Sequence, residues 1–242
     1  MSKQPSSGRC GVCGWVGVFE RGDFGRPPGA SFPCEQCGAR LRYRDEATAV
    51  VEHFGDGEAT CLMELLERPD FAALTVLYVG VSGPLRGRLR ALPNFFECTL
   101  EPPDNNSAKP KRRSYQDLQA LGFAPASFDW IFSSHVMEHV PDPDRAFAEA
   151  HRVLRPGGAL VFSVPMVPSG DTVVRGEVSD GAVVHHLDPK YHRSPQGRSL
   201  VFNDFGEDVA DRLHEHGFEA SVRRPTGPLM TYSNAIVFAA RR

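Results

Sequence analysis

The sequence predicts an α/β protein with a mostly parallel sheet, preceded by a small metal-binding ribbon. Short apolar runs rich in β-branched and aromatic residues alternate with amphipathic helical segments, which is typical of a sheet covered by helices on both faces. Four of the six cysteines form two C-x₂-C pairs near the N-terminus. In a chain of 242 residues, these two features predict a ribbon over residues 1–45 and an α/β domain over residues 46–242.

Composition narrows the function classes. The chain is 41% apolar and 24% charged, as in ordinary globular proteins. With 27 basic and 30 acidic residues, the net charge of −3 disfavours a protein that mainly coats nucleic acid or an anionic membrane. No apolar run reaches the ~18–20 residues of a membrane span, and the first residues lack the apolar core of a secretory signal. We therefore expect no membrane span and a cytoplasmic protein.

The paired cysteines predict a metal site. Their spacing is that of a tetrahedral zinc centre, and a glycine follows each pair. Two disulfides are disfavoured by the cytoplasmic setting, and a redox pair should open a helix, which neither pair does. Four thiolates leave no open position, so we expect a structural Zn²⁺ that supplies folding energy to the ribbon. The predicted ligands are Cys10, Cys13, Cys34 and Cys37.

Two basic segments could contact an anion. Arg40, Arg42 and Arg44 alternate after the second cysteine pair, where we favour a solvated strand face. The run at 109–113 lies in a polar insertion that we interpret as a flexible loop.

The remaining elements follow in order. Helices are expected over 58–66, 85–92, 143–154 (capped by Asp142) and 207–216. Strands are expected over 74–79, 95–100, 128–133, 159–164, 218–222 and 235–240. Residues 165–203 show little regular pattern, and we expect them to form a lid.

Ligands of such sheets bind beyond the carboxyl ends of the strands, where the strand order reverses. Three segments converge there: the glycine turn 80–83, Glu101 after the second strand, and the loop 115–118. An acidic side chain after the second strand can accept both hydroxyls of a ribose. Together these segments predict an adenosine-containing ligand.

The segment from Leu118 to Val140, which contains Phe128-Asp-Trp-Ile-Phe-Ser-Ser-His-Val-Met-Glu-His-Val140, and the later Leu154-Arg-Pro-Gly-Gly158 closely resemble class I S-adenosylmethionine-dependent methyltransferases of the type 11 group. The chain is similar in particular to a bacterial branch with an N-terminal CxxC…CxxC ribbon. The resemblance implies a Rossmann-like seven-stranded methyltransferase sheet whose last strand is antiparallel.

The same resemblance implies that S-adenosylmethionine is the cofactor, with the glycine turn on its methionine part, Glu101 on the ribose and 116–118 flanking the adenine. One departure is that the family's first loop usually begins with an acidic residue, where this chain has Tyr78. The implied cofactor-binding residues are Val79, Gly80, Ser82, Gly83, Glu101, Gln116, Asp117, Leu118, Ser133 and His135.

Methyl transfer to an alcohol or amine gains from a base poised near neutral pH, which histidine supplies. His135 follows the 128–133 strand, where a pocket-shaping role is an equal alternative to a chemical one. His185 and His186 begin a second histidine-rich cluster that ends at His192, in the lid. We expect one of the three to be the base. Glu138 and His139 belong to the first cluster, and the second cluster could also bind a second metal, although it lacks a clean ligand spacing for one.

We therefore expect O-methylation of a small polar acceptor such as a sugar, a glycan precursor or a natural product. A first alternative is an RNA base methyltransferase whose zinc ribbon docks the RNA, which the acidic net charge and the lack of an aromatic base-flipping motif disfavour. A second is a non-catalytic cofactor-binding module. A monomer and a homodimer both remain open.

Overall fold

The computed structural model describes residues 6–20, 32–80, 83–99, 113–167, 169–194, 197–224 and 234–241. The chain divides into two compact units. Unit 1 comprises Met1–Leu74, Gly83–Asn94 and Arg224–Ile236, and unit 2 comprises Thr75–Ser82, Phe95–Arg223 and Val237–Arg242. Among the described residues, no helix is both long and apolar enough to cross a membrane.

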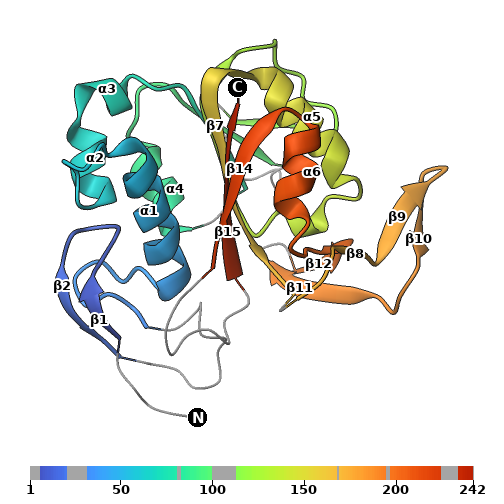
Figure 1. Cartoon of the computed structure of the whole chain (residues 1–242), viewed down its shortest axis with the longest axis horizontal. Helices are drawn as coiled ribbons and strands as arrows, with labels where there is room; N and C mark the ends of the chain where they lie inside the picture. Colours follow the sequence, from blue (N-terminus) through green and yellow to red (C-terminus); the bar gives the residue numbers. More distant parts are fainter. Residues whose placement is uncertain are drawn as a thin grey trace. The chain divides into compact units, whose positions relative to one another are not determined.

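Unit 1 joins the cysteine ribbon to a group of helices (Figure 1). The amide nitrogens of Leu62 and Met63 donate to the carbonyls of Gly11 and Val12, at 2.7 and 3.1 Å. These bonds attach the first cysteine pair to the start of a helix. The elements of unit 1 are β1 (Ser6–Arg9), β2 (Val16–Phe19), α1 (Leu41–Phe54), α2 (Leu62–Glu67), α3 (Pro69–Ala72) and α4 (Pro84–Leu89).

The segment after the second cysteine pair is helical, so the expected strand face at the three arginines is wrong. Helix α1 begins at Leu41, and the boundary predicted at residue 45 falls inside it. Arg44 is buried, with its guanidinium 3.4 Å from the centre of the Phe19 ring, and Arg42 donates to Tyr43 Oη at 2.7 Å. The segment forms a helix because helical spacing places its apolar residues on one buried face of α1. These residues are Leu41, Ala47, Val50 and Val51.

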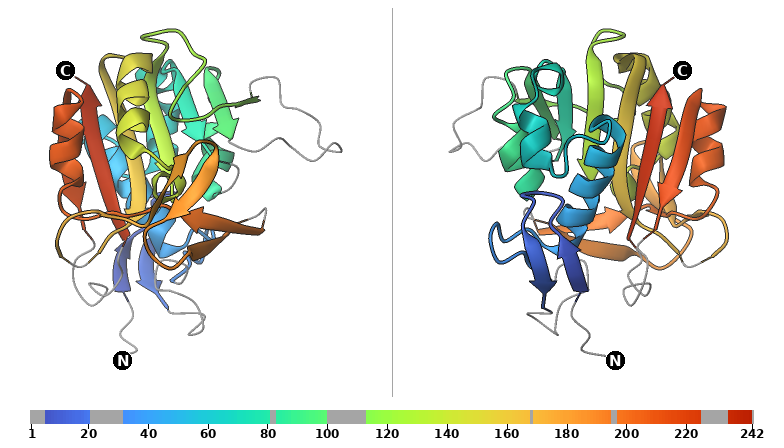
Figure 2. Two further views of the ribbon diagram at one scale, coloured as in Figure 1. Left: turned by 90° about the vertical axis from the view of Figure 1, so that its right-hand side faces the viewer. Right: turned by 60° about the vertical axis from the view of Figure 1, so that its left-hand side comes forward.

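Unit 2 is built on a seven-stranded sheet in the order β14-β15-β7-β6-β3-β4-β5, which confirms the predicted sheet. The neighbouring pairs from β7 to β5 are parallel. The arrows of β14 and β15 point in opposite directions (Figure 2). Strand β5 was not predicted from the sequence, and β7 begins at Leu154 instead of residue 159. The strands are β3 (Val76–Val79), β4 (Phe95–Thr99), β5 (Arg113–Tyr115), β6 (Phe128–Ser134), β7 (Leu154–Pro165), β14 (Phe218–Arg223) and β15 (Asn234–Arg241).

Two helices of unit 2, α5 (Pro143–Val153) and α6 (Val209–Glu215), lie side by side (Figure 1). Asp142 caps α5 as predicted, accepting from the Arg145 amide at 3.1 Å. Phe147 packs on Phe162 of β7 with ring centres 5.8 Å apart. An Arg212–Asp144 ion pair at 2.8 Å joins the two helices.

The lid is more regular than expected. Its strands pair antiparallel as β9–β10, β11–β12 and β8–β13. The overlooked signal is Asp180-Gly181, whose positive φ values of 50° and 77° close the β9–β10 hairpin with a two-residue loop. The lid strands gather at the end of the sheet toward which the parallel strands point (Figure 2). They are β8 (Val173–Val174), β9 (Gly176–Ser179), β10 (Ala182–His185), β11 (Lys190–Ser194), β12 (Gly197–Val201) and β13 (Asn203–Asp204).

Candidate functional site

The strand order reverses between β3 and β6, and the carboxyl ends of these strands are the position predicted for the cofactor. Val79 and Ser133 are register partners there. Gly80 follows β3 with φ +121°, and its amide donates to the Cys98 carbonyl at 3.0 Å. A Cβ at Gly80 would meet Val136 at 3.7 Å, so glycine serves mainly to allow this backbone conformation.

Two side chains at this point have different environments. Ser133 is fully buried, and its hydroxyl has no hydrogen-bond partner among the described residues. Tyr78, at the position of the family's acidic residue, is also buried and stacks on Phe132 with ring centres 5.5 Å apart. Tyr78 thus packs in the core of the sheet, whereas Ser133 leaves a buried polar group for which a ligand could provide a partner.

The loop after β5 lies at the end of β4, because β4 and β5 pair and the Gln116 amide donates to the Thr99 carbonyl at 3.1 Å. Gln116 Oε1 accepts from the Gly122 amide at 2.7 Å, and Asp117 Oδ1 accepts from the Gln119 amide at 2.9 Å. These bonds close a compact turn that contains Leu118.

Two predicted cofactor contacts and most of the basic run at 109–113 cannot be placed in the structure. Ser82, Glu101 and residues 109–112 lie outside the described residues. Gly83 has φ +110° and precedes α4 as its N-cap.

A buried carboxylate lies immediately beyond the carboxyl end of β6. His135 adopts a left-handed backbone conformation with φ 53°, and its amide donates to the Ser163 carbonyl at 2.9 Å. The short 3-10 helix Met137–His139 follows and buries Glu138 almost completely, at 1% exposure. Glu138 Oε1 lies 3.6 Å from His135 Nδ1 and 3.8 Å from His139 Nε2.

The lid docks on this 3-10 helix. The Phe202 amide donates to the Glu138 carbonyl at 2.9 Å, and Asn203 Nδ2 donates to the Val140 carbonyl at 2.8 Å. These contacts bring His192 of β11 to the same carboxylate, with its Nδ1 3.5 Å from Glu138 Oε1. Three histidines therefore surround one oxygen atom. Two of them follow the carboxyl end of β6, and the third belongs to β11.

The electrostatics of Glu138 depend on these histidines. Burial alone raises the pKa of Glu138, but contact with His192 and the charges of His135 and His139 outweigh it. The net pKa of Glu138 lies below its ordinary value, so the carboxylate stays ionised despite its burial.

The other two predicted bases lie outside this cluster. His185 and His186 are exposed, with His185 at the end of β10 and His186 Nε2 3.8 Å from Glu177. The β9–β10 hairpin projects away from the sheet in Figure 1. Glu138 and His192 belong to the two clusters predicted from the sequence, but neither was predicted to be the base. The His-x-x-Glu-His spacing at 135–139 was the available signal for Glu138.

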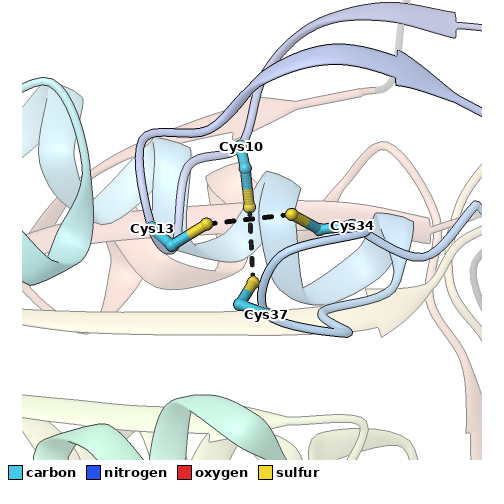
Figure 3. A group of neighbouring side chains, drawn as sticks. All are labelled: Cys10, Cys13, Cys34 and Cys37. Atoms are coloured by element: carbon cyan, nitrogen blue, oxygen red, sulfur yellow. Dashed lines mark hydrogen bonds between the residues drawn. The ribbon is translucent and has the colours of Figure 1, made fainter.

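In unit 1 the four predicted zinc ligands come together (Figure 3). Cys10 and Cys37 sulfurs are 3.7 Å apart, as are those of Cys13 and Cys34. This exceeds the ~2.05 Å of a disulfide and matches the ~3.8 Å between thiolates that each bind zinc at ~2.3 Å in a tetrahedron. The two halves are alike because the Gly14 and Gly38 amides each donate at 2.8 Å to the first cysteine carbonyl of their own pair.

The thiols of this cluster differ in acidity. Burial raises the pKa of Cys10 to about 11 and also raises that of Cys37. Burial acts the same way on Cys34, but the amides of Cys37 and Gln36 and neighbouring thiols outweigh it, so its pKa falls below normal. Amides directed at sulfur are typical of the surroundings of a metal-binding thiolate.

Part of the chain is similar to known methyltransferases. Residues 98–162 match a family model described as a methyltransferase domain. Malonyl-(acyl-carrier protein) O-methyltransferase 1 of Coxiella burnetii is 31% identical over 153 residues, which are 61% of this chain and 53% of the relative. Arsenite methyltransferase of Aquipseudomonas alcaligenes is 36% identical over 103 residues, which are 43% of this chain and 26% of the relative.

A solved S-adenosylmethionine-dependent methyltransferase from Mesorhizobium loti aligns with a TM-score of 0.48 at 19% identity, covering 77% of this chain and 99% of that chain. The chain spans about half or less of the length of the two curated relatives. Residues 98–162 are thus similar to methyltransferase domains, and they lie within a Rossmann-like seven-stranded sheet.

Proposed function

We propose that the protein transfers a methyl group from S-adenosylmethionine to an oxygen atom of a small polar acceptor. The observation that carries the proposal is the docking of the lid on the 3-10 helix, which brings His192 to Glu138 directly beyond the carboxyl end of β6. The Coxiella burnetii relative is named an O-methyltransferase, which supports oxygen as the atom methylated.

The residues where the strand order reverses are suited to bind S-adenosylmethionine. Val79 and Gly80 offer backbone beside β3, and the unpartnered Ser133 hydroxyl offers a buried polar contact beside β6. Gln116, Asp117 and Leu118 are proposed to flank the adenine. When bound, S-adenosylmethionine supplies an electrophilic methyl group on a sulfonium, a leaving group that needs no further activation.

The chain's own contribution is to orient the acceptor and accept its proton. We assign the proton to His135, because this residue follows β6 directly and lies 3.6 Å from Glu138. The buried carboxylate would hold the positive charge that His135 gains. His135 would take the proton of the acceptor O–H group as its oxygen accepts the methyl group, and the sulfonium would keep the S–CH₃ electron pair and leave as a neutral thioether.

We further propose that the four cysteines bind one structural Zn²⁺, supported by the 3.7 Å sulfur spacing. An RNA acceptor is the second candidate. It is disfavoured because Arg44 is buried against Phe19 and Arg42 contacts Tyr43, so only Arg40 of the three arginines is exposed.

Calorimetry of the full chain with S-adenosylmethionine tests cofactor binding. We expect a 1:1 complex that Ser133→Ala weakens by up to ~10-fold, since a hydrogen bond is worth about 0.5–1.5 kcal/mol. Ser127→Ala is the matched control, because that exposed hydroxyl donates to the Ala124 carbonyl near the amino end of β6. No heat of binding in the wild type would remove both enzymatic hypotheses.

A transfer assay tests the acceptor. Release of S-adenosylhomocysteine is measured with simple sugars, phenols, a glycan oligosaccharide and bulk RNA as probes. We expect turnover with a hydroxyl-bearing small molecule, and a greater loss in His135→Ala than in the His185→Ala/His186→Ala double variant. Turnover confined to RNA would establish the second candidate, and the opposite ranking of variants would place the base on β9–β10.

A further inference from the structure

The Glu138 carboxylate is unusual for a buried acid. Neither of its oxygens has a hydrogen-bond partner among the described residues, although the side chain is 1% exposed. Buried carboxylates are normally hydrogen-bonded or bound to a cation, because an unpaired buried charge is costly. Three imidazole nitrogens instead surround Oε1 at 3.5–3.8 Å, beyond hydrogen-bonding distance.

The tautomer of His139 sharpens this observation. Its Nδ1 lies 2.7 Å from the carbonyl oxygen of Leu200, which can only accept, so Nδ1 carries the hydrogen. In a neutral imidazole Nε2 then presents a lone pair, and it faces a carboxylate oxygen 3.8 Å away. Two acceptors that face each other need a hydrogen-bond donor or a cation between them. A backbone carbonyl on the far ring nitrogen is also the usual partner of a metal-binding histidine.

A carboxylate and neutral imidazoles are all electron-pair donors toward a metal cation. A single divalent ion satisfies one carboxylate and neutral imidazoles together. The cluster thus has the composition of a metal site as well as the geometry.

The ligand atoms lie near one another, somewhat farther apart than around a bound ion, so an ion would draw them inward. Adjacent ligand atoms at about 2.0–2.1 Å from an ion are separated by about 2.8–3.4 Å in octahedral and tetrahedral sites. The ligand atoms of Glu138, His139 and His192 all lie within 4.8 Å of one another. The rings of His139 and His192 meet edge to face at 86° with centres 5.2 Å apart. By contrast, His214 faces Asp211 at the same 3.8 Å on the surface as a single pair, so convergence and not distance marks the site.

We propose that Glu138, His139 and His192 bind a divalent first-row transition metal ion. The nitrogen-rich set favours Zn²⁺, Mn²⁺ or Fe²⁺ over Mg²⁺ or Ca²⁺. Three protein ligands leave positions open, as in catalytic metal sites. This inference rests on the proposed function: an acceptor hydroxyl bound to the ion would have a lowered pKa and would give its proton to His135. The acceptor class narrows to oxygen compounds that can bind a metal.

Manganese binding to the full, chelator-treated chain tests the proposal, followed by electron paramagnetic resonance. Mn²⁺ prefers oxygen and nitrogen ligands to thiolates, so the cysteine cluster does not compete. We expect one Mn²⁺ per chain, bound at least ~10-fold more weakly by Glu138→Gln and His192→Ala. The second variant guards against misfolding, since the His192 side chain is 28% exposed.

His214→Ala is the matched control and should bind Mn²⁺ like the wild type. Absence of Mn²⁺, Co²⁺ and additional Zn²⁺ from the wild type would overturn the inference, as would equal binding by Glu138→Gln. Calorimetry with S-adenosylmethionine on the same preparations separates the two hypotheses. If the protein binds the cofactor but not this metal, only the proposed metal site is wrong. If it binds the metal but not the cofactor, only the proposed function is wrong.

Discussion

The two clusters of metal-binding residue types in this protein differ in how the chain assembles them. In unit 1 the four cysteines come as two local pairs, each closed by a glycine turn, and the pairs have nearly the same internal geometry. In unit 2 the Glu138 cluster combines residues of the 3-10 helix after β6 with His192 of β11. The first cluster depends on local turns, and the second depends on tertiary docking.

This difference has an energetic consequence. The ribbon strands are only four residues each, too short to bury a core, so metal binding and folding should be tightly coupled there. The Glu138 cluster sits on a seven-stranded sheet that folds around its own apolar side chains. Disrupting the first cluster should therefore affect folding, whereas disrupting the second should affect chemistry.

Cys13→Ser should abolish zinc binding and unfold the ribbon. Zinc contributes about 10–16 kcal/mol to the folding of small thiolate sites, so losing one ligand removes most of the ribbon's stability. Metal content by mass spectrometry and hydrogen exchange over residues 6–20 are the measurements. Cys61→Ala, a buried cysteine outside the cluster, should keep one zinc. Full protection of residues 6–20 in a zinc-free Cys13→Ser protein would contradict the coupling of metal and fold.

Glu138→Gln should lower methyl transfer by about 10²–10⁴-fold with little loss of the sheet, because general-base chemistry typically contributes that much. The rate of S-adenosylhomocysteine release and the thermal unfolding midpoint are measured together. The matched control is Glu177→Gln, which removes the same charge from an exposed carboxylate that also faces a histidine, His186. Parallel losses of rate and stability in Glu138→Gln would show that the carboxylate is structural.

The same contrast explains what could be predicted from the sequence. The cysteine spacing predicted the four-sulfur cluster, and the apolar runs predicted six of the seven strands of the sheet, because both are local patterns. The choice of His185 and His186 rested on proximity in sequence to other lid histidines. The structure instead brings His192 to Glu138, through backbone bonds from Phe202 and Asn203 that no local pattern specifies. Arg44 likewise lies on a helix, because tertiary burial outweighs its alternation with other arginines.

Gly11→Ala tests whether the ribbon is built into unit 1. A Cβ there would lie 2.2 Å from Thr48 Oγ1 and 2.5 Å from the Arg44 carbonyl, both on α1. Such overpacking costs about 1–3 kcal/mol, measured as a lower urea midpoint. Gly87→Ala, in α4 with nothing within 4 Å of its Cβ, should instead stabilise by about 0.5–1 kcal/mol. An unchanged midpoint in Gly11→Ala would mean that ribbon and helix separate freely.

The smallest expected effect concerns how the lid is held. Asp204 pairs with Arg175 at 2.8 Å and with Lys190 at 2.5 Å. Burial raises the pKa of Asp204, but these two cations outweigh it, and the net pKa lies below normal. A depressed folded-state pKa stabilises above the unfolded value of ~3.9, and this stabilisation is lost as pH falls through the folded value.

Asp204→Asn should therefore cost about 1 kcal/mol near neutral pH, since Lys190 is 42% exposed, and the difference from wild type should vanish in acid. Thermal midpoints of both proteins across pH provide the measurement. Asp180→Asn, at the exposed hairpin turn, should leave the midpoint unchanged, because asparagine also adopts positive φ. If the Asp204→Asn difference persisted below pH ~3, packing rather than charge would hold the lid, and the docking that brings His192 to Glu138 would not depend on this ion pair.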